Sequence, residues 1–223
     1  MSDPGSGGAN EDGVWSQVFV PLTAGERRPA LFLDRDGVIV EDVGHLHREA
    51  DIRLIAGAAE TIVRANQQRV PAVIVTNQSG LGRGLFGWDD FVAVQDEIMR
   101  RLGAMGARVD AVFVCPFHPA ARPPYGHPDH PARKPNPGML LTAARRLGLD
   151  LRASWIVGDR ARDLQAGRAA GLAGGLLIGA GRGDDAEEQT AALALAADER
   201  FHVALGAGVM DACALPLLTG APR

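Results

Sequence analysis

Four aspartates occur in two pairs, and each pair directly follows a short apolar run. Asp34 and Asp36 are separated by one residue, and Asp159 and Asp163 by three. Two carboxylates this close repel each other unless a cation neutralises them or one of them is protonated. A hard divalent cation such as Mg²⁺ prefers oxygen ligands of this kind. The two pairs together therefore predict a magnesium site that takes part in chemistry.

Each pair on its own has a plainer explanation. Asp34 and Asp36 alone fit a solvated acidic turn, and the match to a calcium loop is poor because the third acid is missing. Asp159 and Asp163 alone fit acids that stabilise the N-terminus of a helix. Four carboxylates at neighbouring strand ends exceed what helix capping requires, so the metal-site interpretation is favoured.

Groups that could bind a phosphoryl oxygen accompany the aspartates. Thr76 and Asn77 follow another apolar run, where a hydroxyl and backbone N–H groups are available. Lys134 is the only lysine among 23 basic residues, in a chain that otherwise uses arginine. An ammonium is a compact point charge, unlike the planar guanidinium of Arg83 or Arg133. Chemistry that needs such a charge would explain why this one position has a lysine. A solvated surface lysine is the alternative.

Five apolar runs without polar alternation predict strands buried on both faces, as in a parallel sheet. They are Ala30–Leu33, Ala72–Thr76, Val109–Cys115, Ser154–Val157 and Gly174–Ile178. Helices are expected between them, over 57–69, 89–102, 137–147 (with Asn136 as its cap) and 159–170. This alternation predicts an α/β fold with βαβ units. Open α/β sheets bind ligands at the carboxyl ends of their strands, so the polar side chains there should converge.

Two connecting segments are expected to be loops. The glycine-rich stretch Asn77–Gly87 does not have the spacing of a dinucleotide-binding motif, so we expect a flexible substrate loop that offers Arg83 to an anion. Residues 116–137 contain eight prolines and cannot form regular structure. These loops leave room for side chains that contact a substrate.

The composition excludes several classes of protein. The formal net charge of −4 gives no electrostatic footprint for duplex nucleic acid or an anionic membrane. Two cysteines cannot form a disulfide framework, which fits a reducing cytoplasm. No stretch is long and apolar enough to span a bilayer. We expect a cytoplasmic monomer or small homo-oligomer.

Three segments are expected along the 223 residues. Residues 1–14 are rich in Gly, Ser and Asp and predict a flexible head. Residues 15–183 form the main α/β domain. Residues 184–223 are expected to be a helical extension packed on that domain.

Four motifs in a fixed order resemble the haloacid-dehalogenase-type (HAD) phosphatases. They are Asp-x-Asp-Gly at 34–37, Thr76 at a strand end, the lone Lys134, and Gly-Asp-x-x-x-Asp at 158–163. The resemblance covers about residues 30–180 and implies a Rossmann-like, three-layer fold around a central parallel sheet. The stretches Phe32–Ile39, Val75–Gly80 and Arg133–Gly138 resemble the subgroup that acts on heptose bisphosphate and histidinol phosphate. The gaps between motifs are too short for a cap domain, so the loops 42–54, 77–88 and 116–133 must shape the substrate pocket.

The resemblance also implies roles for individual residues. Asp34 would attack phosphorus, and Asp36 would protonate the leaving alcohol and then activate water. Thr76 and Lys134 would stabilise the transferring phosphoryl group. Mg²⁺ would be held by Asp34, the backbone carbonyl of Asp36, and Asp159, with Asp163 acting through water. The implied substrate-binding residues are Asn77, Gln78, Ser79, Arg83 and Arg133.

The proline-rich loop departs from the pattern of that subgroup, which often holds a structural zinc with three cysteines and one histidine. Cys115 fits the first position, but Phe117 stands where the histidine would be, and the last two cysteines are replaced. Cys115, His118, His127 and His130 could still form a tetrahedral site. The alternative is that the metal has been lost and the prolines stiffen the loop.

The expected function is Mg²⁺-dependent hydrolysis of a small phosphorylated sugar, with heptose 1,7-bisphosphate favoured and histidinol phosphate as the alternative. A third hypothesis is a non-catalytic metal-binding module. The presence of Asp34, Asp36 and Lys134 argues against it. A DNA-end phosphatase is disfavoured by the acidic net charge.

Overall fold

The computed structural model describes residues 8–9, 13–20, 27–179, 186–197 and 200–220. Their core is one eight-stranded sheet with the order β1-β2-β5-β4-β3-β6-β7-β8. Six strands run parallel, and β2 pairs antiparallel with β5 and with β1. The strands are β1 (Gly8–Ala9), β2 (Trp15–Val18), β3 (Leu31–Leu33), β4 (Ala72–Asn77), β5 (Ala111–Cys115), β6 (Trp155–Gly158), β7 (Gly174–Ile178) and β8 (His202–Gly206).

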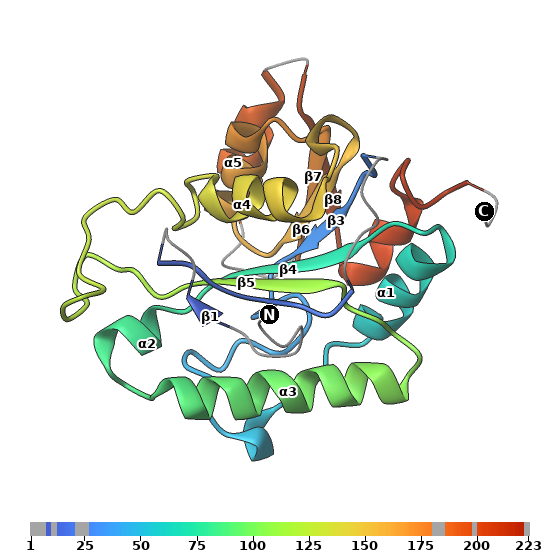
Figure 1. Ribbon diagram of the computed structural model, residues 1–223. Helices are drawn as coiled ribbons and strands as arrows, with labels where there is room; N and C mark the ends of the chain where they lie inside the picture. Colours follow the sequence, from blue (N-terminus) through green and yellow to red (C-terminus); the bar gives the residue numbers. More distant parts are fainter. Residues whose placement is uncertain (1–7, 10–12, 21–26, 180–185, 198–199, 221–223) are drawn as a thin grey trace.

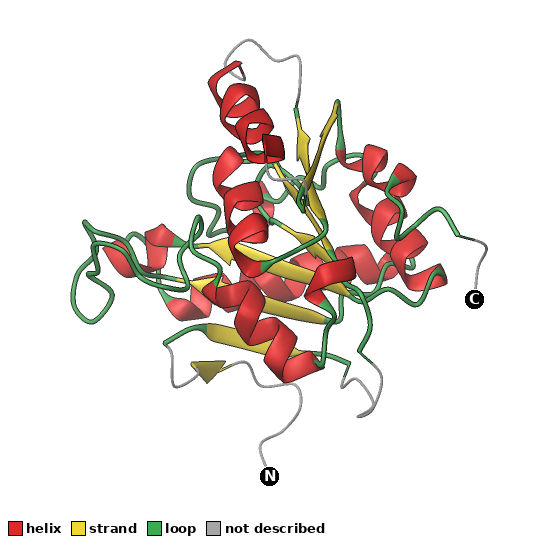
Figure 2. Ribbon diagram, turned by 90° about the horizontal axis from the view of Figure 1, so that it is seen from above, coloured by secondary structure: helices red, strands yellow, loops and turns green. Residues whose placement is uncertain are grey.

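Helices cover both faces of the sheet, which gives three layers (Figures 1 and 2). One face packs against α1 (Ala58–Gln67), α3 (Trp88–Ala104) and the 3-10 helix η4 (Val209–Ala214). The other face packs against α4 (Gly138–Leu147), α5 (Ala161–Ala170) and α6 (Ala186–Leu193). The remaining helices are short: α2 (Ser79–Arg83), η1 (Glu49–Asp51), η2 (Leu151–Ala153) and η3 (Ala194–Ala197).

Strand β3 shows why these runs are apolar at every position. Leu31 and Leu33 belong to the core on the α1 and α3 side, whereas Phe32 belongs to the core on the α4 and α5 side. All three side chains are fully buried. A strand with helices on both faces has no solvent side, so polar alternation disappears.

The order of the strands places the candidate residues at one point. β3 lies between β4 and β6, and the chain winds outward from it in both directions. Such a switch point leaves a crevice at the carboxyl ends of the strands, where α/β proteins bind ligands. The turn after β3 carries Asp34 and Asp36, β4 ends with Thr76 and Asn77, and β6 leads to Asp159.

The predicted α/β fold with a central parallel sheet is confirmed, and so are all five expected strands, with their ends shifted by up to two residues. The proline-rich segment contains no helix or strand, as expected. Between β3 and α1 the only helix is the three-residue η1, so no cap domain is inserted there. Among the described residues, no helix is both long and apolar enough to cross a membrane.

Two expectations about local structure were wrong, and two further segments contain strands that were not expected. The glycine-rich stretch after β4 forms α2 instead of remaining a loop throughout. Helix α4 starts at Gly138 with Pro137 as its cap, so Asn136 does not cap it. The tail adds a strand, β8, to the sheet and is not helical alone. Gly8–Ala9 pair with β2 inside the segment expected to be a flexible head; the rest of that head up to residue 12 lies outside the described residues.

Candidate active site

A polar cleft of about 110 Å³ opens at the carboxyl ends of the central strands. It is lined by Asp34, Asp36, Asp42, Gly44, His45, Thr76, Asn77, Gln78, Ser79, Arg133, Asp159 and Arg162. The lining comes from the loops after β3 and β6, the end of β4, the start of α2, the loop between β5 and α4, and the start of α5. The fold therefore assembles groups that are more than one hundred residues apart in the chain.

Three carboxylates form a cluster that could hold a divalent cation. Asp34, Asp159 and Asp163 each offer an oxygen, and these three atoms lie within 4.8 Å of one another. Burial, together with the charges of Asp34 and Asp163, raises the pKa of Asp159 to about 7. Carboxylates held this close in a buried site need a compensating charge, and oxygen donors suit Mg²⁺. The residues present therefore fit the metal that the sequence predicted.

Glycine 37 makes the close approach of two of these elements possible. Its φ is +83°, a left-handed conformation that favours glycine. A Cβ atom at this position would collide with the carboxylate of Asp159. The turn after β3 can therefore approach Asp159 this closely only because residue 37 has no side chain.

Lys134 lies behind the carboxylates and is completely buried. Its Nζ is 2.9 Å from Asp34 Oδ1 and 2.7 Å from Asp163 Oδ1, and it donates a 2.8 Å hydrogen bond to the carbonyl of Val75. Burial opposes the charged form, but Asp163 and Asp34 outweigh it and hold the pKa of Lys134 above its usual value. The structure therefore places the single lysine of the chain against two of the predicted metal-ligand carboxylates.

The backbone that carries Lys134 is tied to the end of β4 through Asn77. The amide of Asn77 donates a 3.0 Å bond to the Lys134 carbonyl and accepts a 3.1 Å bond from the Lys134 N–H. Asn77 was expected to bind substrate, and it does line the cleft. Its side chain also fixes the backbone of the loop that carries Lys134, a role that the sequence did not reveal.

Asp36 is held by a network of donors. Arg35 donates three hydrogen bonds to its carboxylate, and Gln78 donates a fourth at 2.7 Å. The same Gln78 nitrogen lies 2.9 Å from Thr76 Oγ1. Gln78 was expected to contact substrate, and it lines the cleft; its amide also orients two of the predicted catalytic side chains.

Not every predicted residue reaches the cleft. Ser79 and Arg133 line it, whereas Arg83 is exposed at the end of α2 and does not. Arg162 lines the cleft instead. Its position between Asp159 and Asp163, at the start of a helix, was a usable signal that sequence reasoning missed. Asp42 and His45 were also missed, although their loop was expected to shape the pocket.

The four candidate zinc ligands do not converge. Within the described chain, no three of Cys115, His118, His127 and His130 have ligand atoms within 4.8 Å of one another. Each of the three histidines accepts a backbone N–H at Nδ1. In a neutral ring this places the proton on Nε2, so neither nitrogen offers a lone pair to zinc. Burial raises the pKa of Cys115 to about 11, which disfavours the thiolate that zinc requires.

Aromatic stacking holds this loop where a metal would otherwise do so. The rings of Phe117 and His130 are parallel, with centroids 3.6 Å apart, and His127 meets His130 edge-on at 5.1 Å. Tyr125 contacts Phe117 and accepts a 3.0 Å hydrogen bond from Trp88. The residues in this geometry therefore do not fit a zinc site.

We expect protein purified without added metal to contain far less than one equivalent of zinc. With Mg²⁺ kept in excess over the chelator, EDTA, which binds zinc far more tightly than Mg²⁺, should leave the thermal midpoint of the loop variant Cys115→Ser and of the wild type equally unchanged. Elemental analysis and thermal denaturation test this. Zinc near one equivalent, lost in Cys115→Ser, would contradict it.

The raised pKa of Asp159 predicts a pH-dependent effect of Mg²⁺ on stability. In the unfolded chain this group ionises near its usual value of 3.8, whereas in the metal-free folded protein it ionises only near 7. Its contribution to stability is therefore complete below about pH 4 and is lost as the pH rises through about 7. Mg²⁺ favours the ionised form, so its stabilising effect should be larger at about pH 8 than at about pH 5.5.

Thermal midpoints with and without Mg²⁺ at both pH values measure this difference. In Asp159→Asn the effect of Mg²⁺ should be small and similar at both values. A wild-type shift that does not grow with pH would show that Asp159 is not the group that titrates.

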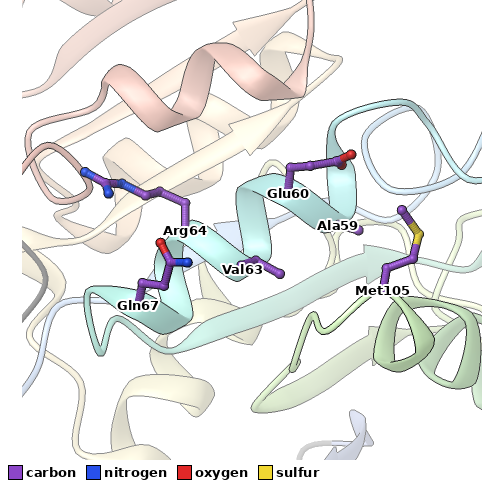
Figure 3. A pocket seen from close by; sticks show the side chains of 6 residues that line it. All are labelled: Ala59, Glu60, Val63, Arg64, Gln67 and Met105. Carbon is purple, nitrogen blue, oxygen red and sulfur yellow. The ribbon is translucent and has the colours of Figure 1, made fainter.

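A second hollow of about 290 Å³ lies elsewhere, along α1 and beside the end of α3 (Figure 3). It is lined by Ala59, Glu60, Val63, Arg64, Gln67 and Met105. Glu60 is its only acid, and Arg64 is engaged with the carbonyls of Leu218 and Gly220. It is larger than the polar cleft but lacks paired carboxylates, so the cleft is the candidate for catalysis.

Comparison with known proteins identifies relatives of this chain. The HAD-hydrolase-like family model matches residues 131–202. A D-glycero-beta-D-manno-heptose-1,7-bisphosphate 7-phosphatase of Mesorhizobium japonicum is 47% identical over 168 residues, which are 75% of this chain and 77% of the relative. The enzyme of the same name from Photorhabdus laumondii is 37% identical over 74% of this chain and 87% of its own length.

Solved structures give the same result. A HAD-like phosphatase from Mesorhizobium loti superposes with a TM-score of 0.72 and 40% identity, covering 87% of this chain and 95% of that one. The D,D-heptose 1,7-bisphosphate phosphatase of B. bronchiseptica, complexed with magnesium and phosphate, superposes with a TM-score of 0.68 and 36% identity. The match covers 86% of this chain and 99% of that one. The fold, the motifs and these relatives agree, and the chain belongs to the D-glycero-D-manno-heptose-1,7-bisphosphate 7-phosphatase family of HAD-like phosphatases.

Proposed function

We propose that the protein removes the 7-phosphate of D-glycero-D-manno-heptose 1,7-bisphosphate through an aspartyl phosphate at Asp34. The observation that carries the proposal is the convergence of Asp34, Asp159, Asp163 and Lys134 at the switch point of the sheet. Membership of a family whose curated relatives carry this activity in their names supports the choice of substrate.

In the first step, an oxygen of Asp34 attacks phosphorus and the bond from phosphorus to the C7 oxygen breaks. Asp34 Oδ1 is already bonded to Lys134 Nζ and to the backbone N–H of Arg35 at 2.7 Å. Oδ2 is therefore the oxygen available for attack. Asp36 donates a proton to the departing C7 oxygen, so the sugar leaves as an alcohol.

In the second step, Asp36, now a carboxylate, takes a proton from water as the water oxygen attacks the phosphorus of the aspartyl phosphate. The bond from phosphorus to Asp34 breaks, which restores the Asp34 carboxylate and releases phosphate. Lys134 and Thr76 are proposed to stabilise the charge on the transferring phosphoryl group. Electrostatic stabilisation of this kind is the main contribution of proteins to phosphoryl transfer.

Asp34, Asp159 and Asp163, with the backbone carbonyl of Asp36, are proposed to hold Mg²⁺. When bound, the cation supplies positive charge that the crowded carboxylates and the phosphoryl group both require. The magnesium in the B. bronchiseptica relative supports this assignment.

The direct test is phosphate release, with Mg²⁺, from a panel that contains both anomers of heptose 1,7-bisphosphate, histidinol phosphate and common sugar phosphates. We expect the largest kcat/KM with one heptose anomer and none in Asp34→Asn. A preference for histidinol phosphate would change the proposed substrate but not the proposed mechanism. Undiminished release by Asp34→Asn would refute the mechanism itself.

A further inference from the structure

We propose that Arg35 is a positioning residue that holds Asp36 in the orientation needed to protonate the leaving alcohol. This inference rests on the proposed function, because it assumes that Asp36 is the general acid. Each side-chain hydrogen bond that the structure shows for Arg35 goes to the Asp36 carboxylate, so it acts through Asp36 and not on the substrate.

The contacts between the two side chains fix the plane of the carboxylate. Arg35 Nε lies 3.1 Å from Asp36 Oδ1, and Nη2 lies 2.9 Å from Oδ1 and 3.0 Å from Oδ2. Gln78 Nε2 adds a contact of 2.7 Å at Oδ2. A guanidinium that contacts both oxygens restricts rotation of the carboxylate in a way that a single ammonium cannot.

Arg35 is itself immobilised. Its side chain is completely buried, and its Cζ lies 5.5 Å from the ring centroid of Phe91 on α3. Phe91 in turn meets Trp15 edge-on at 5.5 Å and Trp88 at 5.8 Å. The core on one face of the sheet therefore fixes the guanidinium, and the guanidinium fixes the catalytic acid.

Stability alone does not account for an arginine at this position. Its Nη1 is buried and has no hydrogen-bond partner in the described part of the chain. Burying a charge with an unsatisfied nitrogen is unfavourable, and an apolar side chain would pack on Phe91 without that cost. A buried ion pair is weak evidence for stabilisation, so the geometry it imposes on Asp36 is the better explanation.

The test compares leaving groups. The C7 alkoxide is a poor leaving group that needs a proton, whereas p-nitrophenolate leaves without one. For each variant, kcat/KM is measured with heptose 1,7-bisphosphate and with p-nitrophenyl phosphate, because kcat/KM reports the step in which the ester bond breaks. The readout is kcat/KM for heptose 1,7-bisphosphate divided by kcat/KM for p-nitrophenyl phosphate. This ratio is compared between each variant and the wild type.

We expect Asp36→Asn to lower kcat/KM for the heptose by about 10²- to 10⁴-fold and that for the aryl ester much less. Arg35→Lys, which keeps the charge but loses the two-oxygen contact, should lower the heptose value by about 10- to 100-fold, with under a threefold change for the aryl ester. The matched control is Arg101→Lys, at a half-buried arginine paired with Glu97 on α3, which should leave both values unchanged.

Equal losses with both substrates, or no loss, in Arg35→Lys would overturn the inference, since a merely structural role lowers both alike. If Arg35→Lys does not fold, Gln78→Leu removes the other donor to Asp36 and should lower the ratio in the same direction by a smaller factor. An unchanged ratio in Gln78→Leu would then overturn the inference. If Asp36→Asn lowers kcat/KM equally for both leaving groups, Asp36 is not the general acid and that part of the proposed function is wrong. This outcome differs from one in which Asp36→Asn discriminates between the substrates but Arg35→Lys does not, which would refute only the role of Arg35.

Discussion

Replacing Lys134 with methionine is expected to remove both catalysis and a large part of the stability of the fold. The ammonium forms ion pairs with both Asp34 and Asp163, and all of its side chain is buried. Its loss leaves Asp163, which is fully buried, and Asp34, which is mostly buried, without their counter-charge. Breaking a buried ion pair by removing one partner costs about 3–5 kcal/mol.

For a chain of this length, that cost corresponds to a fall in the thermal midpoint of about 6–20 °C. The same change should lower kcat/KM by about 10³-fold, because the charge that stabilises the transferring phosphoryl group is gone. Thermal denaturation and phosphate release measure the two effects. The control is Arg152→Met at an exposed cation on η2, which should change neither. Activity within tenfold of wild type in Lys134→Met would contradict the assignment.

Replacing Asp34 with asparagine should instead separate activity from stability. The amide is nearly the same size as the carboxylate but cannot form the aspartyl phosphate, so kcat/KM should fall by about 10⁴-fold or more. Asp34 also contributes to the raised pKa of Asp159, so its removal relieves repulsion between carboxylates even as Lys134 loses one contact. The thermal midpoint of the metal-free protein should therefore change little.

The measurements are phosphate release and thermal midpoints, with Asp96→Asn, at an exposed position on α3, as the control. The dependence of the midpoint on Mg²⁺ should also weaken in Asp34→Asn, because one ligand oxygen is lost. A strong loss of stability in metal-free Asp34→Asn would show that the carboxylate has a structural role that the contacts do not reveal.

Strands and motifs were predictable because each depends on a local signal. The run that forms β3 is apolar at every position, and only a strand covered on both faces has that pattern. Asp34, Thr76, Lys134 and Asp159 follow such runs or lie next to a helix start. The topology of parallel strands then brings their ends together, so the cluster could be expected without coordinates.

Helix α2 could not be predicted, because its glycines are required by distant contacts. A Cβ on Gly80 would collide with Phe86, and one on Gly82 would collide with the carbonyl of Pro116. Glycine in a sequence indicates a loop, but here it permits close packing inside a short helix. The role of Arg35 was hidden for a similar reason. Nothing in the order of residues shows that the side chain of Arg35, between Asp34 and Asp36, contacts the second of them.

The burial of Lys134 has a consequence for chemical labelling. The chain contains one lysine, and its amine is sealed behind two carboxylates. An amine-reactive reagent can therefore modify a lysine side chain only when the segment that carries Lys134 moves away from these carboxylates. The rate of this modification, followed by mass spectrometry at Lys134, reports how often the active site opens in the native protein, and whether Mg²⁺ or phosphate keeps it closed.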